Sequence, residues 1–533
     1  MKTLSLHAAV ATALLVLSAG LAAKPLVVCT EASPEGFDVA LYTSGTTMDA
    51  AAETIFNRLV DFAPGTTDIV PGLAQSWQIS GDGKTYTLQL RRGVKFHSTD
   101  YFTPSRPFNA DDVLWSFNRQ YDPQHPWHRL STLGFPYFES MAMRELIERI
   151  DKVDDYQVRF VLRRAEAPFL RDLAMAFASI YSAEYADQLL KAGNMADLNS
   201  KPIGTGPFMF GRYAKDAQIR FKANPDYYAG KPPADPLVFA ITTDSNVRKQ
   251  KLLANECQVA VYPKPEDIAG LKANRDIQVD ELEALITSYL AINTRRPWLG
   301  DVRVRQALAM AFDKRLFIDT LFGSGNATRG IGPYPPTLLG YNSAIDDVPH
   351  DPAQARALLQ AAGVPEGTRL TVFVRNGGGV TNPNPALAAQ LLQADLAKVG
   401  LQLDIRTFEW GELLRRIKVG DGEHDLVFYG WAGDNGDPDN FLSPNLSCEA
   451  ANNGENAARW CNQDFDQLIT QAREQTEPSA RAALYRKAQE VFHQQQPWIS
   501  LAHPKLFTAR RNTVVGFHIS PLTHNNFATT QVK

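Results

Sequence analysis

The sequence lacks the short motifs that mark several common enzyme classes. It has no GxSxG segment for a serine hydrolase, no HExxH segment for a zinc protease, and no GxxxxGKS or GxxxxGKT segment for nucleotide phosphates. Its cysteines show no CxxC-type spacing, which disfavours a zinc site. The alternative of an exported peptidase therefore has neither a nucleophile nor a metal constellation. We predict a protein that is not an enzyme and that uses no metal or other cofactor.

An excess of charge of either sign is also missing. The 533 residues contain 54 Lys and Arg against 58 Asp and Glu, a formal net charge of -4. This weak negative balance argues against nucleic acid or an anionic membrane surface as the main partner. The length exceeds that of one ordinary domain, so two or three domains are expected.

The first residues have the features of a secretory signal peptide. Met1 and Lys2 give a positive start, an apolar run extends from Ala8 to Leu17, and small residues gather between Ser18 and Ala23. A membrane anchor is the alternative, but the apolar run is too short to span a bilayer comfortably. We therefore expect residues 1–23 to be removed after export, and we see no later segment with the character of a transmembrane helix.

The chain has four cysteines, Cys29, Cys257, Cys448 and Cys461. An exported protein with a small, even number of cysteines is expected to form disulfides. Sequence alone permits three connectivities. Proximity favours a bond between Cys448 and Cys461, which leaves Cys29 to pair with Cys257.

Two kinds of hydrophobic pattern divide the chain. Early segments alternate apolar and polar residues, as antiparallel strands do, and Asn109 followed by Asp112 predicts a capped helix start. From about residue 289 onward, strand-like and helix-like runs alternate, which is typical of an α/β domain. Together they suggest two lobes joined by more than one crossing. The expected elements are a hairpin of 77–79 with 85–90, strands at 158–162, 288–293, 370–374, 401–405, 425–429 and 498–502, and helices at 304–316 and from 385.

The segment Gly430–Asn440 follows one of these expected strands and is rich in aspartate. A calcium loop is one interpretation, but Pro438 lies inside it and the twelfth position counted from Asp434 is Asn445 rather than Glu. A solvated acidic turn is a second interpretation. The third is that Asp434, at a strand end beside Trp431 and glycines, receives an ammonium group.

Three smaller features have less specific interpretations. The run Gly377–Gly379 is weak evidence for a phosphate cradle, because no capped helix with a lysine follows it. We interpret it as a loop after a strand, at a position that lines ligand clefts in α/β domains. His503 and His524 are expected to be hydrogen-bonded structural residues.

Nine segments, in order along nearly the whole chain after residue 23, match one family pattern. They are Ser33–Phe37, Thr43–Thr47, Pro71–Ala74, Asp82–Thr87, Arg92–His97, Ala110–Val113, Ile203–Phe208, Val304–Leu308 and Gly433–Asn440. In these segments the chain resembles the peptide/nickel class of periplasmic binding proteins, and most closely its dipeptide binders. The four cysteines also match two disulfides of those binders, with the pairing favoured above.

The resemblance implies an α/β fold of two lobes with a hinge, in which the larger lobe carries an additional β-rich subdomain. Residues 24–284 and 502–533 would form the larger lobe, and residues 285–501 the smaller α/β lobe. The implied protein is a periplasmic monomer that captures dipeptides or short peptides and delivers them to ABC importer permease subunits at the inner membrane. The alternative is another cargo, such as haem, a nickel chelate or an opine-like metallophore.

The resemblance also implies a binding site. In dipeptide binders, the aspartate that matches Asp434 holds the peptide's ammonium group. Trp431, Ala432 and Gly433 match a backbone strip that pairs with the peptide, and Thr43 matches a contact from the other lobe. A further residue, Trp410, lies in a segment similar to one near the family's ligand pocket.

One position departs from the family pattern. Dipeptide binders have an arginine shortly before an Asn-Pro-Asn sequence, and this arginine pairs with the peptide's carboxylate. Here Asn382-Pro383-Asn384 is preserved, but Gly379 stands at the arginine position and Val380 and Thr381 replace its neighbours. Arg375 is the candidate replacement. Without one, the ligand would be a longer peptide or one with a blocked C-terminus.

Overall fold

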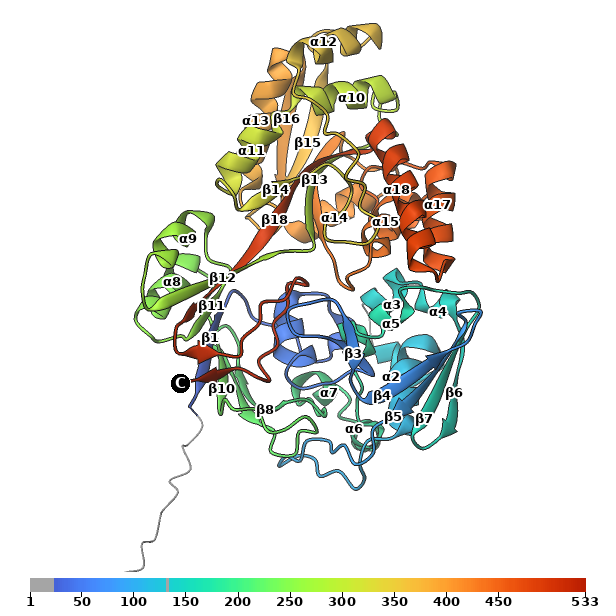
Figure 1. Ribbon diagram of the computed structural model, residues 1–533, viewed down its shortest axis with the longest axis vertical. Coiled ribbons are helices and arrows are strands. Elements are labelled where there is room, and N and C mark those ends of the chain that lie inside the picture. The colour runs from blue at the N-terminus through green and yellow to red at the C-terminus, as the bar shows by residue number, and fades with distance from the viewer. Residues whose placement is uncertain (1–23, 131–133) are drawn as a thin grey trace, which may run out of the picture.

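The computed structural model describes residues 24–130 and 134–533 and has two lobes stacked along its long axis (Figure 1). The chain begins in the larger lobe, builds the smaller lobe and then returns to the larger one, so the described N- and C-terminal ends lie in the same lobe. The expected signal peptide, residues 1–23, lies outside the described residues. Within the described part of the chain, no helix is long and apolar enough to cross a membrane.

Besides β12 (Ile277–Glu283), five strands of the main sheet lie in the larger lobe. β1 (Leu26–Thr30) pairs in parallel with β10 (Leu237–Ile241) and β11 (Val259–Val261). β9 (Gln218–Ala223) and β8 (Phe208–Ala214) extend the sheet by antiparallel pairing. Exposed and buried side chains alternate along β9, because one face of this strand packs against the core of the lobe.

A separate antiparallel sheet forms the additional β-rich subdomain that we predicted. Its strands are, in spatial order, β4 (Ala74–Ile79), β5 (Thr85–Leu90), β7 (Gln157–Leu162) and β6 (Ile147–Asp154). The expected hairpin and the strand near 158–162 are therefore confirmed. Along β5, Tyr86, Leu88 and Leu90 are buried on the same face, as their alternation predicted.

The predicted helix start at Asn109 is also confirmed. α2 (Ala110–Tyr121) begins with a reciprocal cap, in which the Asn109 side chain accepts a hydrogen bond from the Asp111 N–H and the Asp112 carboxylate accepts one from the Asn109 N–H. The cap satisfies N–H groups that have no partner within the helix.

The remaining α-helices and strands of the larger lobe are α1 (Gly45–Thr47), β2 (Val60–Phe62), β3 (Ile69–Pro71), α3 (Pro136–Ser140), α4 (Met143–Leu146), α5 (Phe169–Asp172), α6 (Ala183–Ala192), α7 (Asp197–Ser200), α8 (Ser245–Leu253), α9 (Pro265–Lys272), β12 (Ile277–Glu283), β19 (Val514–Val515) and β20 (Gln531–Val532).

The smaller lobe has the predicted α/β arrangement, with helices on both faces of a sheet (Figure 1). The sheet contains β16 (Gln402–Phe408), β15 (Arg369–Arg375), β17 (Leu426–Ala432), β13 (Ile286–Ile292) and the first part of β18 (Trp498–Arg511), and β14 (Ala327–Arg329) pairs with β18. Side chains alternate between two cores: Leu426 and Phe428 face one, and Val427 and Tyr429 face the other. β15 is parallel to both β16 and β17.

Two sets of helices cover these two cores. The first set contributes to the core of Leu426 and consists of α10 (Val302–Ala311), α11 (Lys314–Leu321), α12 (Pro352–Ala361) and α13 (Pro385–Lys398). The second contributes to the core of Val427 and includes α14 (Trp410–Lys418), α15 (Asp439–Leu446), α17 (Gln463–Glu474) and α18 (Pro478–Gln495), with the short α16 (Ala450–Asn453) following α15. Both faces of the sheet are therefore buried.

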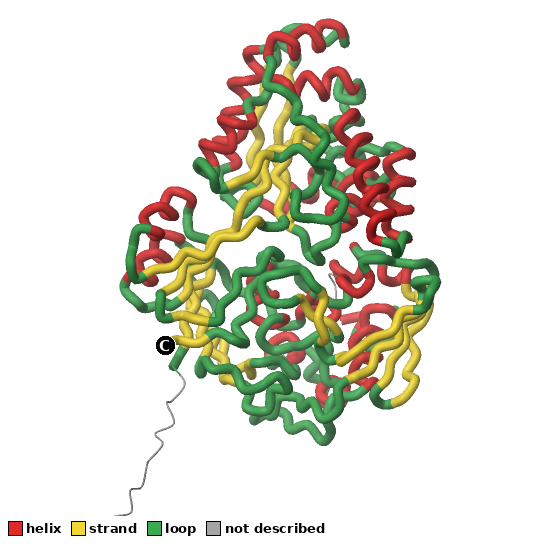
Figure 2. The backbone as a smooth tube through the Cα atoms, viewed as in Figure 1, coloured by secondary structure: helices red, strands yellow, loops and turns green. Residues whose placement is uncertain are grey.

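The lobes are connected by a pair of hydrogen-bonded segments (Figures 1 and 2). β12 leads through Ala284 and Leu285 directly into β13, and β18 runs back antiparallel to both. The first part of β18 therefore belongs to the smaller lobe and its last part to the larger lobe. The lobe boundaries expected near 284 and 502 lie on these segments, and their role as the limits of moving units stays a prediction.

Two expected elements differ from the structure. The helix expected over 304–316 is two helices, α10 and α11, because Phe312 is extended and Asp313 caps α11 by accepting a hydrogen bond from the Leu316 N–H at 3.0 Å. An aspartate stabilises a helix more at the N-cap than in its interior. The strand expected over 498–502 continues to Arg511, since it gains a second set of partners in the other lobe.

Both favoured disulfides are present. Cys29 is bonded to Cys257 and Cys448 to Cys461, with sequence separations of 228 and 13 residues. The first bond joins β1 to the segment between α8 and β11 and lies in a small hydrophobic cluster with Leu252 and Ala260. The second staples the region between α15 and α17. The Cys29–Cys257 bond closes the longer loop, so it restrains far more of the unfolded chain.

We expect the two disulfides to contribute unequally to stability. By the chain-entropy relation, removal of the Cys29–Cys257 bond costs about 5 kcal/mol and removal of the Cys448–Cys461 bond about 3 kcal/mol. The double substitution C29S/C257S should therefore lower the midpoint of thermal unfolding more than C448S/C461S does. Differential scanning calorimetry checks the ranking, and a larger loss for C448S/C461S would contradict it.

Candidate ligand-binding site

Asp434 lies just beyond the end of β17, in a loop organised by Asn440. The side-chain oxygen of Asn440 accepts hydrogen bonds from the Asp434 N–H at 2.9 Å and from the Trp431 indole N–H at 3.0 Å. Its amide nitrogen donates to the Asp434 carboxylate at 3.3 Å. The Gly433 N–H donates to the Leu285 carbonyl at 2.6 Å, which continues the pairing of β17 with the chain that enters β13. One side chain from α15 thus orients both Trp431 and Asp434.

The opposite lobe contributes the second donor to this carboxylate. The Tyr137 hydroxyl, on α3, donates to Asp434 Oδ1 at 2.8 Å and lies 3.5 Å from the Thr43 carbonyl oxygen. A cavity of about 110 Å³ is lined at this place by residues of both lobes, among them Thr43, Tyr137, Ala432, Asp434 and His524. Asp434 therefore lies at a cavity between the lobes, where a ligand can contact both of them.

The electrostatics of Asp434 differ from those of its neighbour Asp437. Burial raises the pKa of Asp434 to about 6, although the bonds from Tyr137 and Asn440 oppose the increase. None of the ion pairs formed by the described residues involves Asp434. In contrast, Arg481 donates to both oxygens of Asp437 at 2.6 and 2.8 Å and its charge holds the pKa of Asp437 below the usual value, against the opposing effect of burial. Asp437 is thus neutralised by an ion pair with Arg481, whereas Asp434 forms no ion pair with the described residues and is influenced only weakly by the charge of His524, on the same cavity.

The predicted site residues fall into two groups. Thr43, Ala432 and Asp434 line the cavity between the lobes. Trp431 and Gly433 flank Ala432 in the chain, but the Trp431 indole is bound to Asn440 and neither residue is part of the cavity wall. The second group, Arg375, Gly379, Val380, Thr381 and Trp410, follows the ends of β15 and β16 and lies outside this cavity wall.

The second group is connected to β17 by packing. A side chain at Gly430 would place its Cβ 2.4 Å from the Thr381 Cβ, so Thr381 lies directly over the strand at this glycine. The Trp410 ring stacks on Tyr429 with centroids 5.6 Å apart. The residues expected near the ligand therefore gather at one edge of the smaller lobe's sheet, where the carboxyl ends of β15 and β17 meet.

The glycine run is explained by the loop's own packing. Gly377 has a φ of +77°, which favours glycine. A Cβ at Gly378 would lie 2.1 Å from the Pro383 carbonyl oxygen, and a Cβ at Gly379 would lie 2.9 Å from Arg375 Nη1. Gly377 and Gly378 thus have separate conformational and steric reasons, whereas a Cβ at Gly379 would meet only the movable end of a side chain. This supports the loop interpretation over a phosphate cradle.

Sequence reasoning missed Tyr137 and Asn440 as hydrogen-bond partners of Asp434, and it did not place His524 in the wall of the cavity. Tyr137 lies 297 positions away, and no spacing rule connects it to the loop. Asn440 lies inside the aspartate-rich segment. Because asparagine side chains often form hydrogen bonds with the backbone of their own loop, this residue could have been predicted to organise the segment. His524 has the expected structural contact, with Nδ1 3.3 Å from Glu53 Oε1, and it also lines the cavity. His503 is buried and bonded to Ile286 and Thr287, as expected.

Further contacts join the lobes on the side away from the connecting strands. The Ala167 N–H donates to the Arg473 carbonyl at 2.8 Å, and Arg473 Nε lies 3.5 Å from the Glu166 carboxylate. The Asn435 amide donates to Asp172 at 2.7 Å. Burial raises the pKa of Glu166 to about 8, which the charge of Arg473 opposes. The seam therefore buries carboxyl groups that water would solvate if the lobes separated.

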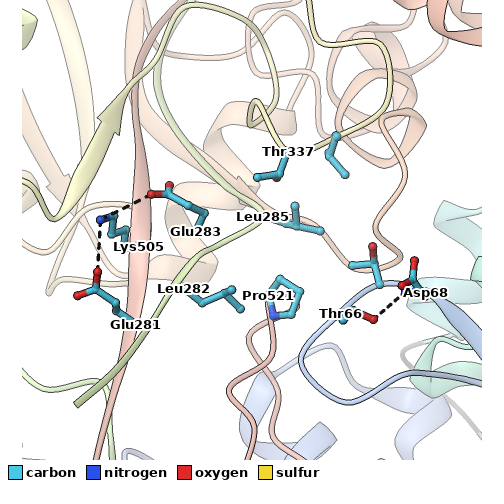
Figure 3. Close-up of a pocket in the computed structure, with 11 residues that line it drawn as sticks. Thr66, Asp68, Glu281, Leu282, Glu283, Leu285, Thr337, Lys505 and Pro521 are labelled. Carbon is cyan, nitrogen blue, oxygen red and sulfur yellow. Dashed lines mark hydrogen bonds and ion pairs between the residues drawn. The ribbon is translucent and has the colours of Figure 1, made fainter. Parts of the chain in front are cut away.

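A second cavity, of about 410 Å³, lies beside the connecting strands (Figure 3). Leu285, Thr337 and Pro521 bring three parts of the chain together at its centre. Lys505 lies between Glu281 and Glu283, 3.6 and 3.7 Å from their carboxylates. The charged groups at this end of the cavity are therefore paired with one another.

Two lobes connected at one side, with a cavity between them, define the class of hinged binding proteins. The chain belongs to the bacterial extracellular solute-binding proteins, family 5. The sequence pattern of this family, described as family 5 Middle, matches residues 68–453.

Among similar proteins, di/tripeptide-binding protein 4 of Pseudomonas aeruginosa (strain UCBPP-PA14) is 63% identical over 99% of this chain and 98% of the relative. Heme-binding protein A of Haemophilus influenzae is 44% identical over 94% of this chain and 91% of the relative. The crystal structure of a dipeptide-binding protein from Pseudoalteromonas sp. SM9913 in complex with Met-Leu matches with a TM-score of 0.86 and 37% identity, over 96% of this chain and all of that one.

We expect Asp434 to destabilise the protein without ligand at neutral pH. Since the folded state raises its pKa to about 6, the stability that this carboxyl contributes below about pH 4 is lost as the pH rises through about 6. At pH 7.5, Asp434→Asn should therefore raise the unfolding free energy by roughly 2–3 kcal/mol, and at pH 4 it should have little effect.

Thermal unfolding of ligand-free protein at the two pH values measures this difference. Asp437→Asn is the matched control and should destabilise at pH 7.5, because it leaves the buried Arg481 without its carboxylate. An equal effect of Asp434→Asn at both pH values would contradict the assignment.

Proposed function

We propose that the protein is the solute-binding component of an ABC importer, which captures a dipeptide or short peptide between its lobes and delivers it to permease subunits at the inner membrane. The observation that carries this proposal is the carboxylate of Asp434, which lines a cavity between the lobes and forms no ion pair with any of the described residues. The names of the relatives and of the matched complex support the same cargo. We further propose that it acts as a periplasmic monomer.

The ammonium group of a peptide complements this carboxylate in charge and in hydrogen bonding. Asp434 Oδ1 accepts a bond from Tyr137 and Oδ2 accepts one from Asn440. Since each carboxylate oxygen accepts two bonds, capacity remains for the N–H donors of an ammonium group. Such a charge-assisted bond is about twice as strong as a neutral one, and it offsets the cost of burying the carboxylate.

The main chain beside Asp434 supports binding of an extended peptide. β17 pairs along its whole length with β13, from Leu426 to Ala432. On its other side it pairs with β15 at Leu426 and Val427 only, among the strands described. No described strand pairs with that side of β17 at Trp431 and Ala432. In our proposal the main chain of a ligand pairs there, which binds peptides without regard to their side chains.

Contributions from both lobes give a reason for closure. Thr43 and Tyr137 approach the cavity from the larger lobe, and Ala432 and Asp434 approach it from the smaller lobe. In our proposal, residues 24–284 with 502–533 and residues 285–501 move as units about the connecting strands. A ligand that contacts both units shifts the population toward the closed form, which the permease would recognise.

We expect Asp434→Ala to lower the affinity for a dipeptide with a free N-terminus about a hundredfold, because removing one partner of a buried charge pair costs roughly 2–5 kcal/mol. N-acetylation of the dipeptide should have a similar effect on the unchanged protein. Isothermal titration calorimetry measures both, with Asp404→Asn as the control on the neighbouring strand β16.

The same titrations with haem and with a nickel–histidine chelate test the alternative cargo. Tighter binding of either than of the peptides would refute the proposed cargo.

Binding should also weaken in acid. Below about pH 6 the carboxyl of Asp434 takes up a proton and loses its charge, so the affinity for a dipeptide should fall up to tenfold with each further pH step of one. The Asp434→Ala variant should not show this dependence. Titrations from pH 7.5 to 4.5 test the prediction, and parallel curves for the two proteins would contradict it.

A further inference from the structure

Arg375 is a cation held in place without an ion pair. Its guanidinium carbon lies 5.0 Å from the centre of the Trp410 ring, which in turn stacks on Tyr429. No carboxylate of the described residues lies within ion-pair distance of Arg375, and its Nε is buried without a hydrogen-bond partner. The carboxylate of Glu409, next to Trp410, instead accepts hydrogen bonds from the Gly411 and Glu412 N–H groups at the start of α14. The aromatic stack therefore orients a guanidinium that remains free for another partner.

The guanidinium of Arg375 lies directly against the backbone of Gly379. A Cβ at Gly379 would lie 2.9 Å from Arg375 Nη1, so it would displace the end of this flexible side chain. The loop is held in that position by reciprocal backbone bonds between Gly379 and Asn382, at 2.9 and 3.1 Å. The guanidinium of Arg375 therefore lies where a side chain at residue 379 would begin, and a long side chain there would have to displace it.

The stack lies on the ligand side of the smaller lobe. Arg375 ends β15, and β15 is parallel to β17, whose end leads to Asp434, so the two charges lie beyond the same edge of the sheet. Thr381, in the loop that follows Arg375, packs over Gly430 of β17. Trp410 and Val380 are 37% and 38% exposed, which keeps this group accessible to a ligand.

We propose that Arg375 receives the carboxylate at the end of the ligand opposite its ammonium group, with Trp410 as the positioning residue. The inference rests on the proposed function and adds to it the ligand's chemical class, a short peptide with a free C-terminal carboxylate. A planar guanidinium binds a carboxylate through two parallel N–H bonds. The role that the family pattern gives to an arginine at position 379 is thus performed here by a side chain from the end of β15.

The test compares a dipeptide with its C-terminal amide, by calorimetry, on the unchanged protein and on Arg375→Ala. The unchanged protein should bind the acid at least tenfold more tightly than the amide, and Arg375→Ala should bind the two almost equally. Arg369→Ala is the matched control, since Arg369 is the exposed first residue of the same strand. Persistence of the preference in Arg375→Ala, or its absence in the unchanged protein, would overturn the inference.

A second pair of variants tests the competition for space. G379R alone should disturb Arg375 and lower affinity, whereas R375A/G379R should recover a preference for the acid that R375A has lost. Failure of the double variant to recover any preference would show that position 379 does not face the same carboxylate.

An N-acetylated dipeptide, measured with the same proteins, separates this inference from the proposed function. If Arg375→Ala still discriminates against the acetylated ligand, the variant is folded and its ammonium site is intact. If the unchanged protein binds acetylated and free dipeptides equally, the proposed function fails whatever Arg375 does.

Discussion

The connection of the lobes through one hydrogen-bonded pair of segments constrains the rest of the molecule. β12 and β13 follow one another along one segment, and β18 pairs with both on the way back. Since the chain passes between the lobes on the same side in both directions, no strand pairing among the described residues joins the lobes on the opposite side. The contacts of Tyr137, Glu166 and Asp172 with the smaller lobe lie away from the connecting strands and consist of side-chain and loop interactions.

Asp434 and Asp437 show how two carboxylates of one loop can have different electrostatic surroundings. The carboxylate of Asp434 forms no ion pair with the described residues, and its raised pKa shows that burial disfavours its charge. Asp437, three residues later, has the guanidinium of Arg481 and a lowered pKa. The two aspartates thus differ in their surroundings, because the charge of Asp437 is paired within the lobe and that of Asp434 faces the cavity.

Local patterns predicted the elements whose stability is mainly local. The alternation along β5 and the cap at Asn109 are recognisable because period and capping depend on residues close in sequence. The break between α10 and α11 was missed because Asp313 caps the second helix inside a continuous helical pattern. The full length of β18 was missed because its second half, beyond Ala502, pairs with β12, more than 200 residues away in the chain.

The sequence by itself indicated the α/β class, favoured the cysteine pairing that the structure shows, and made Asp434 a candidate for an ammonium group, since these follow from periodicity, spacing and a strand-end motif. It also showed that position 379 lacks an arginine. Only the tertiary structure brought Tyr137 to Asp434 and placed the guanidinium of Arg375 in the space that Gly379 leaves empty, stacked on Trp410. Those contacts depend on how separate strands and lobes pack, and side-chain packing between distant segments leaves no periodic signal in the chain.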